Sequence, residues 1–456
     1  MSFLLHAPGP ELLKNLSGLQ AVLSGVFPLK SRHRSDLPLA VRDLSRLLTS
    51  ERGQRRVYWA QPRFVAAYLN YFLPWNLLRL AWLLPGLPLL PPVSPKQRQG
   101  IAPFAGKAGP GADLPATDRS GAVRVLDLGS GPLTLPLGLW LSRPELRTRK
   151  LHLLCTDSSP HPLNLGRALL ENLAGRFYTT GPDKLFPWEL RLERGTWEAA
   201  LHGEKGRFEL ITAANLLNEL SGRPRDAEER LEEKSSALFR AMHLALAPGG
   251  RIFLLEPGTR LGARLIVRMR SLALERGYLL ESPCTHRMFC PLGHRTGEGG
   301  ARRGPAGLEA NSGRSREAFL QERGRGVRLN SAWCHFSFSA AGAWPELLDL
   351  SRDAGLEKER LHLACLLLRK PGTDSAPQPE KHSSRLRVRV VSDPLYLPAG
   401  RGIARYVCSA LGLGLLRSSE DLPSGMLVEA VVPGWPDKAK KDPKSGAWEM
   451  LLNLTK

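Results

Sequence analysis

The chain has 456 residues, 42% of them hydrophobic, so it is long enough for two or three domains with sizeable cores and is not a disordered tail. Its 64 Lys and Arg residues against 43 Asp and Glu residues give a net charge of +21. This excess predicts a polyanionic partner, nucleic acid or an anionic membrane face, unless a high arginine content is general to the source proteome. Six irregularly spaced cysteines indicate a reducing compartment and no disulfide framework.

The N-terminal residues lack the segments of a secretory signal and carry few arginines for a transit peptide. The run 71–93 has the length of a membrane span, but Arg79 and five prolines interrupt it, which favours a buried helix. We therefore expect a cytoplasmic protein, or a mitochondrial matrix protein if the source is eukaryotic, with no membrane partner.

Apolar residues recur every three or four positions in PLAVRDLSRLLTSERG and in PRFVAAYLNYFLPWNLLRLAWLL. This period predicts a helical N-terminal domain over residues 1–92. Residues 93–121 are rich in Pro, Gly, Ala and charged residues without an apolar period, which predicts a linker.

From residue 122 to 370, short apolar runs alternate with helical patterns. Alternating strands and crossover helices predict a parallel sheet covered on both faces, the Rossmann-like α/β arrangement. An insertion that carries cysteines, 284–335, interrupts this domain before its last strand. The predicted strands are 122–131, 150–159, 189–197, 207–217, 250–258, 277–284 and 360–370.

Three further segments differ from this pattern. Residues 291–330 are Gly-rich and contain eight arginines, which predicts a mobile segment. Residues 385–435 alternate like the strands of a small β module, and the lysine-rich residues 436–456 are expected to be a basic tail.

A glycine loop, Asp127-Leu-Gly129-Ser130-Gly131-Pro, follows the first strand of the sheet. In parallel sheets, ligands bind beyond the carboxyl ends of the strands, where a β–α turn presents backbone N–H groups. The two glycines permit a tight turn and a close approach of the cofactor. Asp127 is placed to hold the turn or the amino-acid part of S-adenosylmethionine, and Asp157, which ends the second strand, to accept hydrogen bonds from ribose hydroxyls.

The loop departs from two known fingerprints. Thr134 stands where the dinucleotide pattern G-x-G-x-x-G has its third glycine, which disfavours NAD and FAD. Leu133 stands at the third glycine of the methyltransferase pattern D-x-G-x-G-x-G, which predicts a narrowed pocket.

No catalytic residue can be assigned. Enzymes of this fold that methylate amino groups place an Asn/Asp-Pro-Pro-aromatic box after the fourth strand, and this strand runs instead into Asn215-Leu-Leu-Asn218-Glu219. These side chains either cap the next element or line the cofactor site, for which Asn215 is our candidate. Glu256-Pro-Gly-Thr259 is either a turn or a wall of the pocket.

The cysteines fall into two groups. Cys155 and Cys365 lie within apolar strands and are expected to be core residues. Four separated thiolates that converge would suit an iron–sulfur cluster or a zinc ion, although C-x5-C is not the usual zinc spacing. A nearby histidine, His286, His294 or His335, is an alternative fourth ligand. The candidate ligands are Cys284, Cys290, Cys334 and Cys408.

The motifs LDLGSGP, TDSS, NLLNEL, LLEPGT, PC-x-H-x3-CP and WCHFS, in this order, resemble a methyltransferase-like family associated with the small ribosomal subunit, known from mitochondria and with bacterial members. The resemblance runs from about residue 35 to about 415. It implies a Rossmann-like S-adenosylmethionine methyltransferase fold and a [4Fe–4S] cluster held by Cys284, Cys290, Cys334 and Cys408.

The resemblance also implies ribosomal RNA of the small subunit as the partner, and not DNA. Two functions follow from it: an iron–sulfur-dependent factor for small-subunit assembly and translation, or an active S-adenosylmethionine-dependent rRNA methyltransferase. A zinc-stabilised RNA-binding module is a third possibility.

Overall fold

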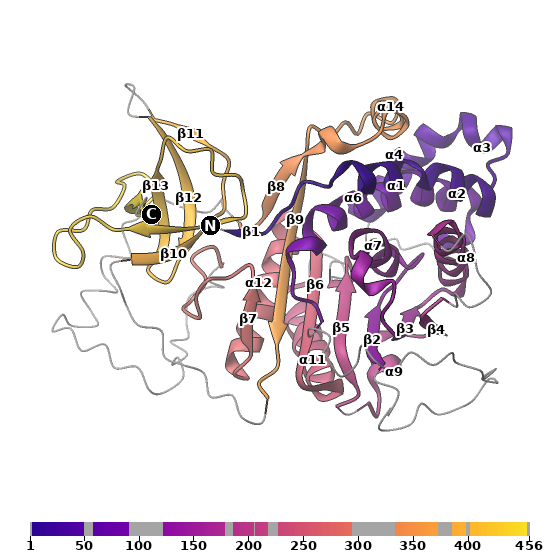
Figure 1. Cartoon of the computed structure of the whole chain (residues 1–456), viewed down its shortest axis with the longest axis horizontal. Coiled ribbons are helices and arrows are strands. Elements are labelled where there is room, and N and C mark those ends of the chain that lie inside the picture. The colour runs from indigo at the N-terminus through magenta and orange to yellow at the C-terminus, as the bar shows by residue number, and fades with distance from the viewer. Residues whose placement is uncertain are drawn as a thin grey trace.

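Two β-sheets organise the chain, an open sheet within a helical body and a closed barrel at one end of it (Figure 1). The computed structural model describes residues 2–49, 58–90, 122–177, 186–204, 206–217, 227–293, 333–372, 385–397 and 402–453. The whole of the predicted linker 93–121 lies outside these residues, as does nearly all of the arginine-rich segment 291–330.

The open sheet has eight strands in the order β4-β3-β2-β5-β6-β9-β7, with β8 paired to β9. The strands from β4 to β6 are parallel, and the order reverses between β2 and β5, which creates the switch point where ligands bind in such sheets. The strands are β2 (Val123–Leu128), β3 (Leu151–Asp157), β4 (Trp188–Arg194), β5 (Phe208–Ala214), β6 (Leu246–Pro257), β7 (Leu279–Ser282), β8 (Phe336–Ser339) and β9 (Arg360–Arg369).

The strand pattern predicted a wholly parallel sheet, and this was wrong for its last strands. Strand β9 lies between β6 and β7 and runs antiparallel to both, and β8 pairs antiparallel with β9. A strand that is buried on both faces reads as a continuous apolar run whichever way it points. The run in β9 therefore predicted a central strand but not its direction.

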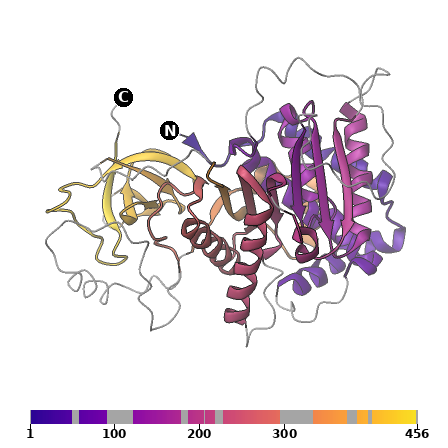
Figure 2. The same ribbon diagram turned by 90° about the horizontal axis from the view of Figure 1, so that it is seen from below.

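Helices cover both faces of the sheet (Figure 2). On one face α7 and α8 pack with the N-terminal helices, and on the other face α9, α11 and α12 form a second core. Strand β2 contributes side chains to both cores: Val123 and Val125 belong to the first, and Leu126 and Leu128 belong to the second. The helices are α7 (Thr134–Ser142), α8 (Pro160–Phe177), α9 (Trp197–Leu201), α11 (Ala227–Ala245), α12 (Arg260–Glu275) and α14 (Pro345–Asp353).

The N-terminal helices share one hydrophobic core with the first face of the sheet. Leu80 of α6 is fully buried against Gly138 of α7, whose missing side chain makes room for it. Most of the run 71–90 is buried here, and no helix in the described part of the chain is long and apolar enough to span a membrane. These helices are α1 (Pro10–Ser17), α2 (Leu19–Val26), α3 (Ser31–Ser35), α4 (Leu37–Thr49), α5 (Pro62–Ala67) and α6 (Leu73–Leu83), with a π-helical turn, η3 (Tyr68–Phe72), between the last two.

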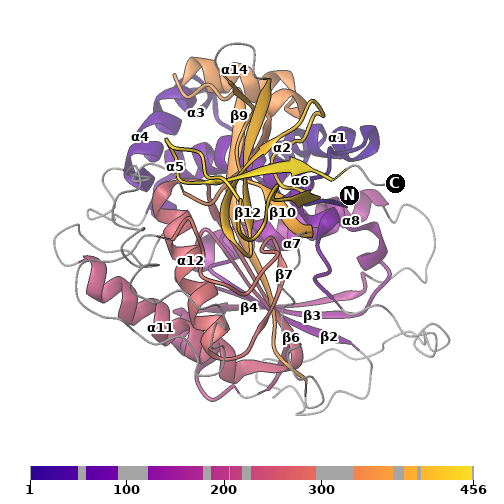
Figure 3. The same ribbon diagram turned by 90° about the vertical axis from the view of Figure 1, so that its left-hand side faces the viewer.

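The second sheet closes into a barrel, because β15 pairs with both β13 and β14. Val388, Val407 and Met450 lie in its own core. The short strand β1 pairs with β14, and the N-terminus accordingly lies beside the barrel in Figure 3. The strands are β1 (Ser2–Phe3), β10 (Arg385–Val390), β11 (Leu395–Tyr396), β12 (Ile403–Ser409), β13 (Gly412–Arg417), β14 (Met426–Val431) and β15 (Trp448–Leu452).

The stretch 436–456, which we expected to be a basic tail, contains the strand that closes the barrel. Ala447 and Met450 are each only 1% exposed. The lysines at 438–444 dominate the composition of this stretch and hide the short strand that follows them. The β module therefore extends beyond residue 435, to residue 452.

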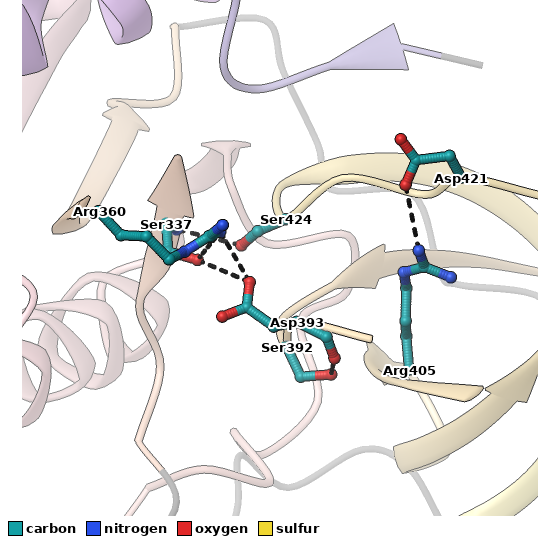
Figure 4. Close-up of polar contacts among 7 residues, drawn as sticks. All are labelled: Ser337, Arg360, Ser392, Asp393, Arg405, Asp421 and Ser424. Atoms are coloured by element: carbon teal, nitrogen blue, oxygen red, sulfur yellow. Dashed lines mark hydrogen bonds and ion pairs between the residues drawn. The ribbon is translucent and has the colours of Figure 1, made fainter. Parts of the chain in front are cut away.

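Barrel and body meet along a polar and apolar interface. Arg360 of β9 donates hydrogen bonds of 2.8 Å to Asp393 Oδ1 and to Ser337 Oγ, and Ser337 Oγ donates to the same carboxylate oxygen at 3.0 Å (Figure 4). The backbone N–H of Ser337 donates to Ser424 Oγ at 3.2 Å. Side chains on the outer face of β12 and β13, among them Ala404, belong to the core of the body.

Candidate functional site

The glycine loop after β2 has the geometry that its sequence predicts. Gly129 and Gly131 adopt left-handed φ angles of 65° and 52°, which glycine allows without strain. The backbone N–H of Ser130 donates to Thr156 O at 2.9 Å and its hydroxyl to Asp127 O at 2.8 Å. These bonds fix the loop at the switch point, directly before the N-terminus of α7.

Leu133, the departure from the glycine pattern, is accommodated by a glycine elsewhere. Leu133 is fully buried with a φ of 54°, a left-handed conformation that costs a non-glycine residue about 1 kcal/mol. A Cβ at Gly166 of α8 would lie 2.6 Å from Leu133 Cγ and 2.4 Å from the carbonyl carbon of Pro132. The side chain of Leu133 thus packs towards α8, in space that Gly166 leaves open.

We expect Gly166→Ala to lower the free energy of unfolding by about 2–3 kcal/mol, because the new methyl group overlaps the backbone of the loop. Gly175→Ala, in the same helix, meets no atom within 4 Å and should raise it by up to about 1 kcal/mol through helix propensity. Urea denaturation of both variants measures this difference. Equal effects would contradict the packing of Leu133 against α8.

Asp157 at the end of β3 supports the glycine loop. Its Oδ2 accepts the backbone N–H of Gly131 at 3.0 Å, and its Oδ1 accepts that of Ser159 at 2.9 Å. Burial raises the pKa of this carboxyl, and the two hydrogen bonds oppose the rise. Ser158 Oγ also donates to Oδ1, at 3.5 Å, so it is Oδ2 that keeps a lone pair for a ligand hydroxyl.

Asp127 has one occupied and one unoccupied carboxylate oxygen. Thr212 Oγ1 donates to Oδ1 at 2.7 Å, while Oδ2 is buried without a hydrogen-bond partner among the described residues. Burial raises the pKa of Asp127 from 3.8 to about 6. The unoccupied oxygen can accept a hydrogen bond from an ammonium or amide group.

The pKa of Asp127 predicts a pH-dependent stability. The folded state binds this proton more tightly than the unfolded chain does, so the contribution of Asp127 to stability is fully present below pH 3.8 and is lost as the pH rises through about 6. Two pKa units correspond to about 3 kcal/mol. Asp127→Asn cannot ionise, so its unfolding free energy should lack this fall. Urea denaturation between pH 4 and pH 7.5 tests the difference, and parallel profiles for the two proteins would contradict it.

The segments after β5 and β6 hold each other at the same edge of the sheet. Asn215 has a φ of 62° and its N–H donates to Leu255 O at 2.7 Å. The side chain of Leu216 lies over Gly129, where a Cβ would be 3.0 Å from its Cδ1. Glu256 is fully buried and accepts the N–H of Leu217 at 2.8 Å, so it anchors this segment. Asn218 and Glu219 lie outside the described residues.

Thr259 caps a helix. Its Oγ1 accepts the backbone N–H of Gly262 at 3.2 Å, at the first turn of α12. In the Glu-Pro-Gly-Thr motif the first two residues therefore end β6, and Thr259 starts α12.

Four of the six cysteines meet where the barrel contacts the body. Cys284 and Cys290 lie in the loop after β7, Cys334 lies before β8, and Cys408 lies in β12 of the barrel. Burial and then the charges of Cys290, Cys284 and Cys408 raise the pKa of Cys334 well above its usual value. The pKa of Cys408 is raised in the same way by burial and by Cys290 and Cys284. These four thiols, and Cys365 of β9 with them, are thus close enough for their charges to affect one another.

Two buried arginines lie beside these thiols. Arg270 of α12 is 3% exposed and donates to His286 O at 2.8 Å and to Met288 O at 2.7 Å. Burial acts against its charge, but the thiolate charges of Cys284 and Cys290 raise its pKa overall. Arg389 of β10 donates to Pro283 O at 2.9 Å.

Within the described part of the chain, the guanidinium groups of Arg270 and Arg389 donate to backbone carbonyl oxygens, and neither forms an ion pair with a carboxylate. Buried cations are normally paired with an anion, and although burial keeps the pKa values of Cys290 and Cys408 raised, the charge of Arg270 opposes that rise. Sequence reasoning missed these arginines, because α12 and β10 each carry several arginines and nothing in the local pattern marks the buried one.

The histidines differ in their relation to the thiols. His286 Nε2 lies 3.2 Å from Cys408 Sγ, and burial followed by the charge of Arg270 lowers its pKa to about 4, so it is neutral at pH 7. His335 stacks on Trp333 and its Nδ1 contacts Trp333 O at 3.1 Å. His294 lies outside the described residues. Cys365 is buried in β9 as expected, with its pKa raised to about 12 by burial.

Within the described part of the chain, no three His, Cys, Asp or Glu side chains are arranged to hold a single metal ion. In a mononuclear zinc site, every ligand sulfur lies about 2.3 Å from the same zinc ion. The four thiols are neighbours, but they are not gathered around one such point.

The strand order, the glycine loop after β2 and the antiparallel β9 between β6 and β7 define a Rossmann-like fold of the methyltransferase type. Residues 122–299 match the family model described as mitochondrial small ribosomal subunit Rsm22. The match confirms the resemblance to a methyltransferase-like family of the small ribosomal subunit. No curated protein matches the chain.

Solved structures resemble the chain only distantly. YjhP from E. coli is 18% identical over 31% of this chain and 44% of its own, with a TM-score of 0.19. A methyltransferase from Pyrococcus furiosus is 17% identical over 35% and 67%, with a TM-score of 0.24. The precorrin-6y C5,15-methyltransferase of Geobacter metallireducens is 15% identical over 36% and 68%, with a TM-score of 0.23. The chain spans less than half the length of YjhP.

Proposed function

We propose that this protein is an assembly or translation factor of the small ribosomal subunit that binds rRNA and holds a [4Fe–4S] cluster. The observation that carries the proposal is the convergence of four thiols from separate segments beside two buried arginines. The family match supports the small subunit as partner and a mitochondrial matrix location. The proposed ligands are Cys284, Cys290, Cys334 and Cys408.

The residues present fit a cluster better than a single ion. In a [4Fe–4S] cluster each iron takes its own thiolate, so the sulfurs lie further apart than around one zinc ion. A cluster with four thiolates carries net negative charge, which Arg270 and Arg389 would balance. When bound, the cluster would join loop 284–290 and residue 334 of the body to β12 of the barrel.

S-adenosylmethionine is the proposed ligand of the glycine loop. The unoccupied oxygen of Asp127 and the spare lone pair of Asp157 Oδ2 support this site. The side chain of Leu216, which lies over Gly129, reduces the space available to a cofactor at this site. The proposed contacts are Asp127, Gly129, Ser130, Gly131, Asp157 and Asn215.

An active rRNA methyltransferase is the alternative function, favoured by the same two carboxylates. An assay that measures transfer of a tritiated methyl group to immature small subunits distinguishes the binding factor from the methyltransferase. We expect no incorporation above that of an Asp157→Asn variant. If the wild-type protein incorporated the methyl group robustly and the Asp157→Asn variant did not, the protein would be a methyltransferase and the proposed binding role would be refuted.

Binding to rRNA should fall steeply with salt, because each phosphate that Lys or Arg neutralises releases counterions. For a site with six or more phosphate contacts, we expect the affinity to drop by about a thousandfold between 50 and 200 mM salt. Fluorescence anisotropy with a small-subunit rRNA fragment measures this dependence. A flat dependence would contradict the role given to the net charge of +21.

A further inference from the structure

The barrel has the strand order of a known oligonucleotide-binding fold. Around the closed ring the strands follow the order β10, β12, β13, β15, β14 and back to β10. Numbered along the chain this is 1-2-3-5-4-1, with the third and fifth strands parallel. This is the order of the OB fold, which binds oligonucleotides on its second and third strands and with its 1–2 and 4–5 loops. A fold alone does not establish binding, so the side chains must decide.

The usual binding face of this barrel is covered. The outer side chains of β12 and β13, including Ala404, Leu413 and Leu415, pack into the core of the body, and Cys408 lies among the thiols. Nucleic acid therefore cannot lie across these strands. What stays accessible is the loop 432–447 between β14 and β15, together with β11 in the loop between β10 and β12.

The loop 432–447 is basic and exposed. It carries four lysines and two aspartates, and all four lysines are exposed. One of the aspartates, Asp442, accepts hydrogen bonds from Ser445 N at 2.8 Å and from Ser445 Oγ at 2.6 Å, so it is used within the loop. The ammonium groups remain available to phosphates. The lysines are Lys438, Lys440, Lys441 and Lys444.

Aromatic rings lie among these charges. Trp435 and Trp448, which stand near the two ends of the loop, are partly exposed and meet edge to face at 5.5 Å. Lys441 Nζ lies 4.3 Å from the centre of the Trp448 ring. On β11, Tyr396 is 80% exposed. Aromatic faces interleaved with lysines are the composition that binds single strands, because unpaired bases stack while phosphates meet cations.

We propose that the loop 432–447 binds single-stranded RNA, with its lysines on the phosphates and with the exposed ring of Tyr396 as a stacking surface for a base. The inference rests on the proposed function, which makes rRNA the partner, and it assigns the contact to one loop of the barrel. Duplex RNA offers no free base faces, so it fits this surface less well.

The test uses the full chain and a fluorescent single-stranded RNA of twelve nucleotides, measured by anisotropy at several salt concentrations. In the loop variant, Lys438→Gln, Lys440→Gln and Lys444→Gln are combined. We expect its affinity to be at least tenfold lower at low salt and its log–log salt slope to be shallower by about 2, because each lost phosphate contact removes about 0.7. Tyr396→Ala, which changes an exposed ring and no charge, should weaken binding at least about fivefold.

A matched control removes the same charge elsewhere. Lys30→Gln, Arg32→Gln and Arg34→Gln change exposed residues at or beside α3, at the end of the molecule opposite the barrel (Figure 1). This variant should keep most of the affinity, and melting curves should show that both variants stay folded. An equal loss in both variants, or equal binding of the RNA as a single strand and as a duplex, would overturn the proposal.

Failure of the loop assignment can be told apart from failure of the proposed function. A wild-type protein that binds no small-subunit rRNA at all refutes the proposed function. A wild-type protein that binds while the loop variant binds equally well refutes only the assignment to 432–447. Displacement of the RNA by polyglutamate at matched charge would reduce the loop to an unselective polyanion surface and would also overturn it.

Discussion

Replacing Cys334 by serine is expected to abolish the iron and sulfide content of the protein purified without oxygen. Cys334 lies next to β8 of the body and is coupled electrostatically to Cys290, Cys284 and Cys408. Serine is a poor ligand for iron, so one corner of the cluster would lose its bond to the protein. Structural zinc sites in small peptides contribute about 10 kcal/mol or more of apparent binding free energy, and a cluster would likewise hold separate segments of this chain together. We therefore expect the melting temperature to fall by on the order of 10 °C or more.

The matched control for this variant is Cys155→Ser. Cys155 is a buried cysteine in β3, where it packs in the core of the body. This variant should keep the iron and sulfide of the wild-type protein, whatever its own loss of stability. Full iron and sulfide in Cys334→Ser would refute the ligand assignment. Wild-type protein with one equivalent of zinc and no sulfide would refute the cluster.

Arg270→Lys has the second largest expected effect. The guanidinium of Arg270 donates to His286 O and to Met288 O and so fixes the loop between Cys284 and Cys290. A lysine ammonium keeps the charge but cannot reach both carbonyls with the planar geometry of arginine. Hydrogen bonds to charged groups contribute about 1.5–3 kcal/mol each, so we expect the free energy of unfolding to fall by about 3 kcal/mol.

The same substitution should also lower the iron content, because the loop that carries two proposed ligands loses its support. Arg240→Lys on α11 is the matched control, since Arg240 is exposed. Urea denaturation and iron analysis of the two variants give the comparison. If Arg270→Lys were as stable and as rich in iron as Arg240→Lys, the arginine would not position the loop.

Local sequence signals predicted the elements of the sheet well. The runs that end at Asp127 and Asp157 form β2 and β3, and the glycines of the loop take the left-handed angles that the pattern requires. These features depend on neighbouring residues, through apolar period and backbone freedom, so they can be read from the chain itself. The role of Glu256 could not be read in this way, because its partner is the N–H of Leu217, on the segment after another strand.

By itself the sequence determined the alternation of strands and helices, the glycine loop at the end of β2 and the set of cysteines available as ligands. The tertiary structure decided the direction of β9, the closure of the barrel by β15 and the meeting of Cys408 with the cysteines of the body. It also placed Arg270 and Arg389 beside those thiols. Direction, closure and convergence depend on which distant segments pair, and the apolar pattern of a strand records its burial but not the identity of its neighbours.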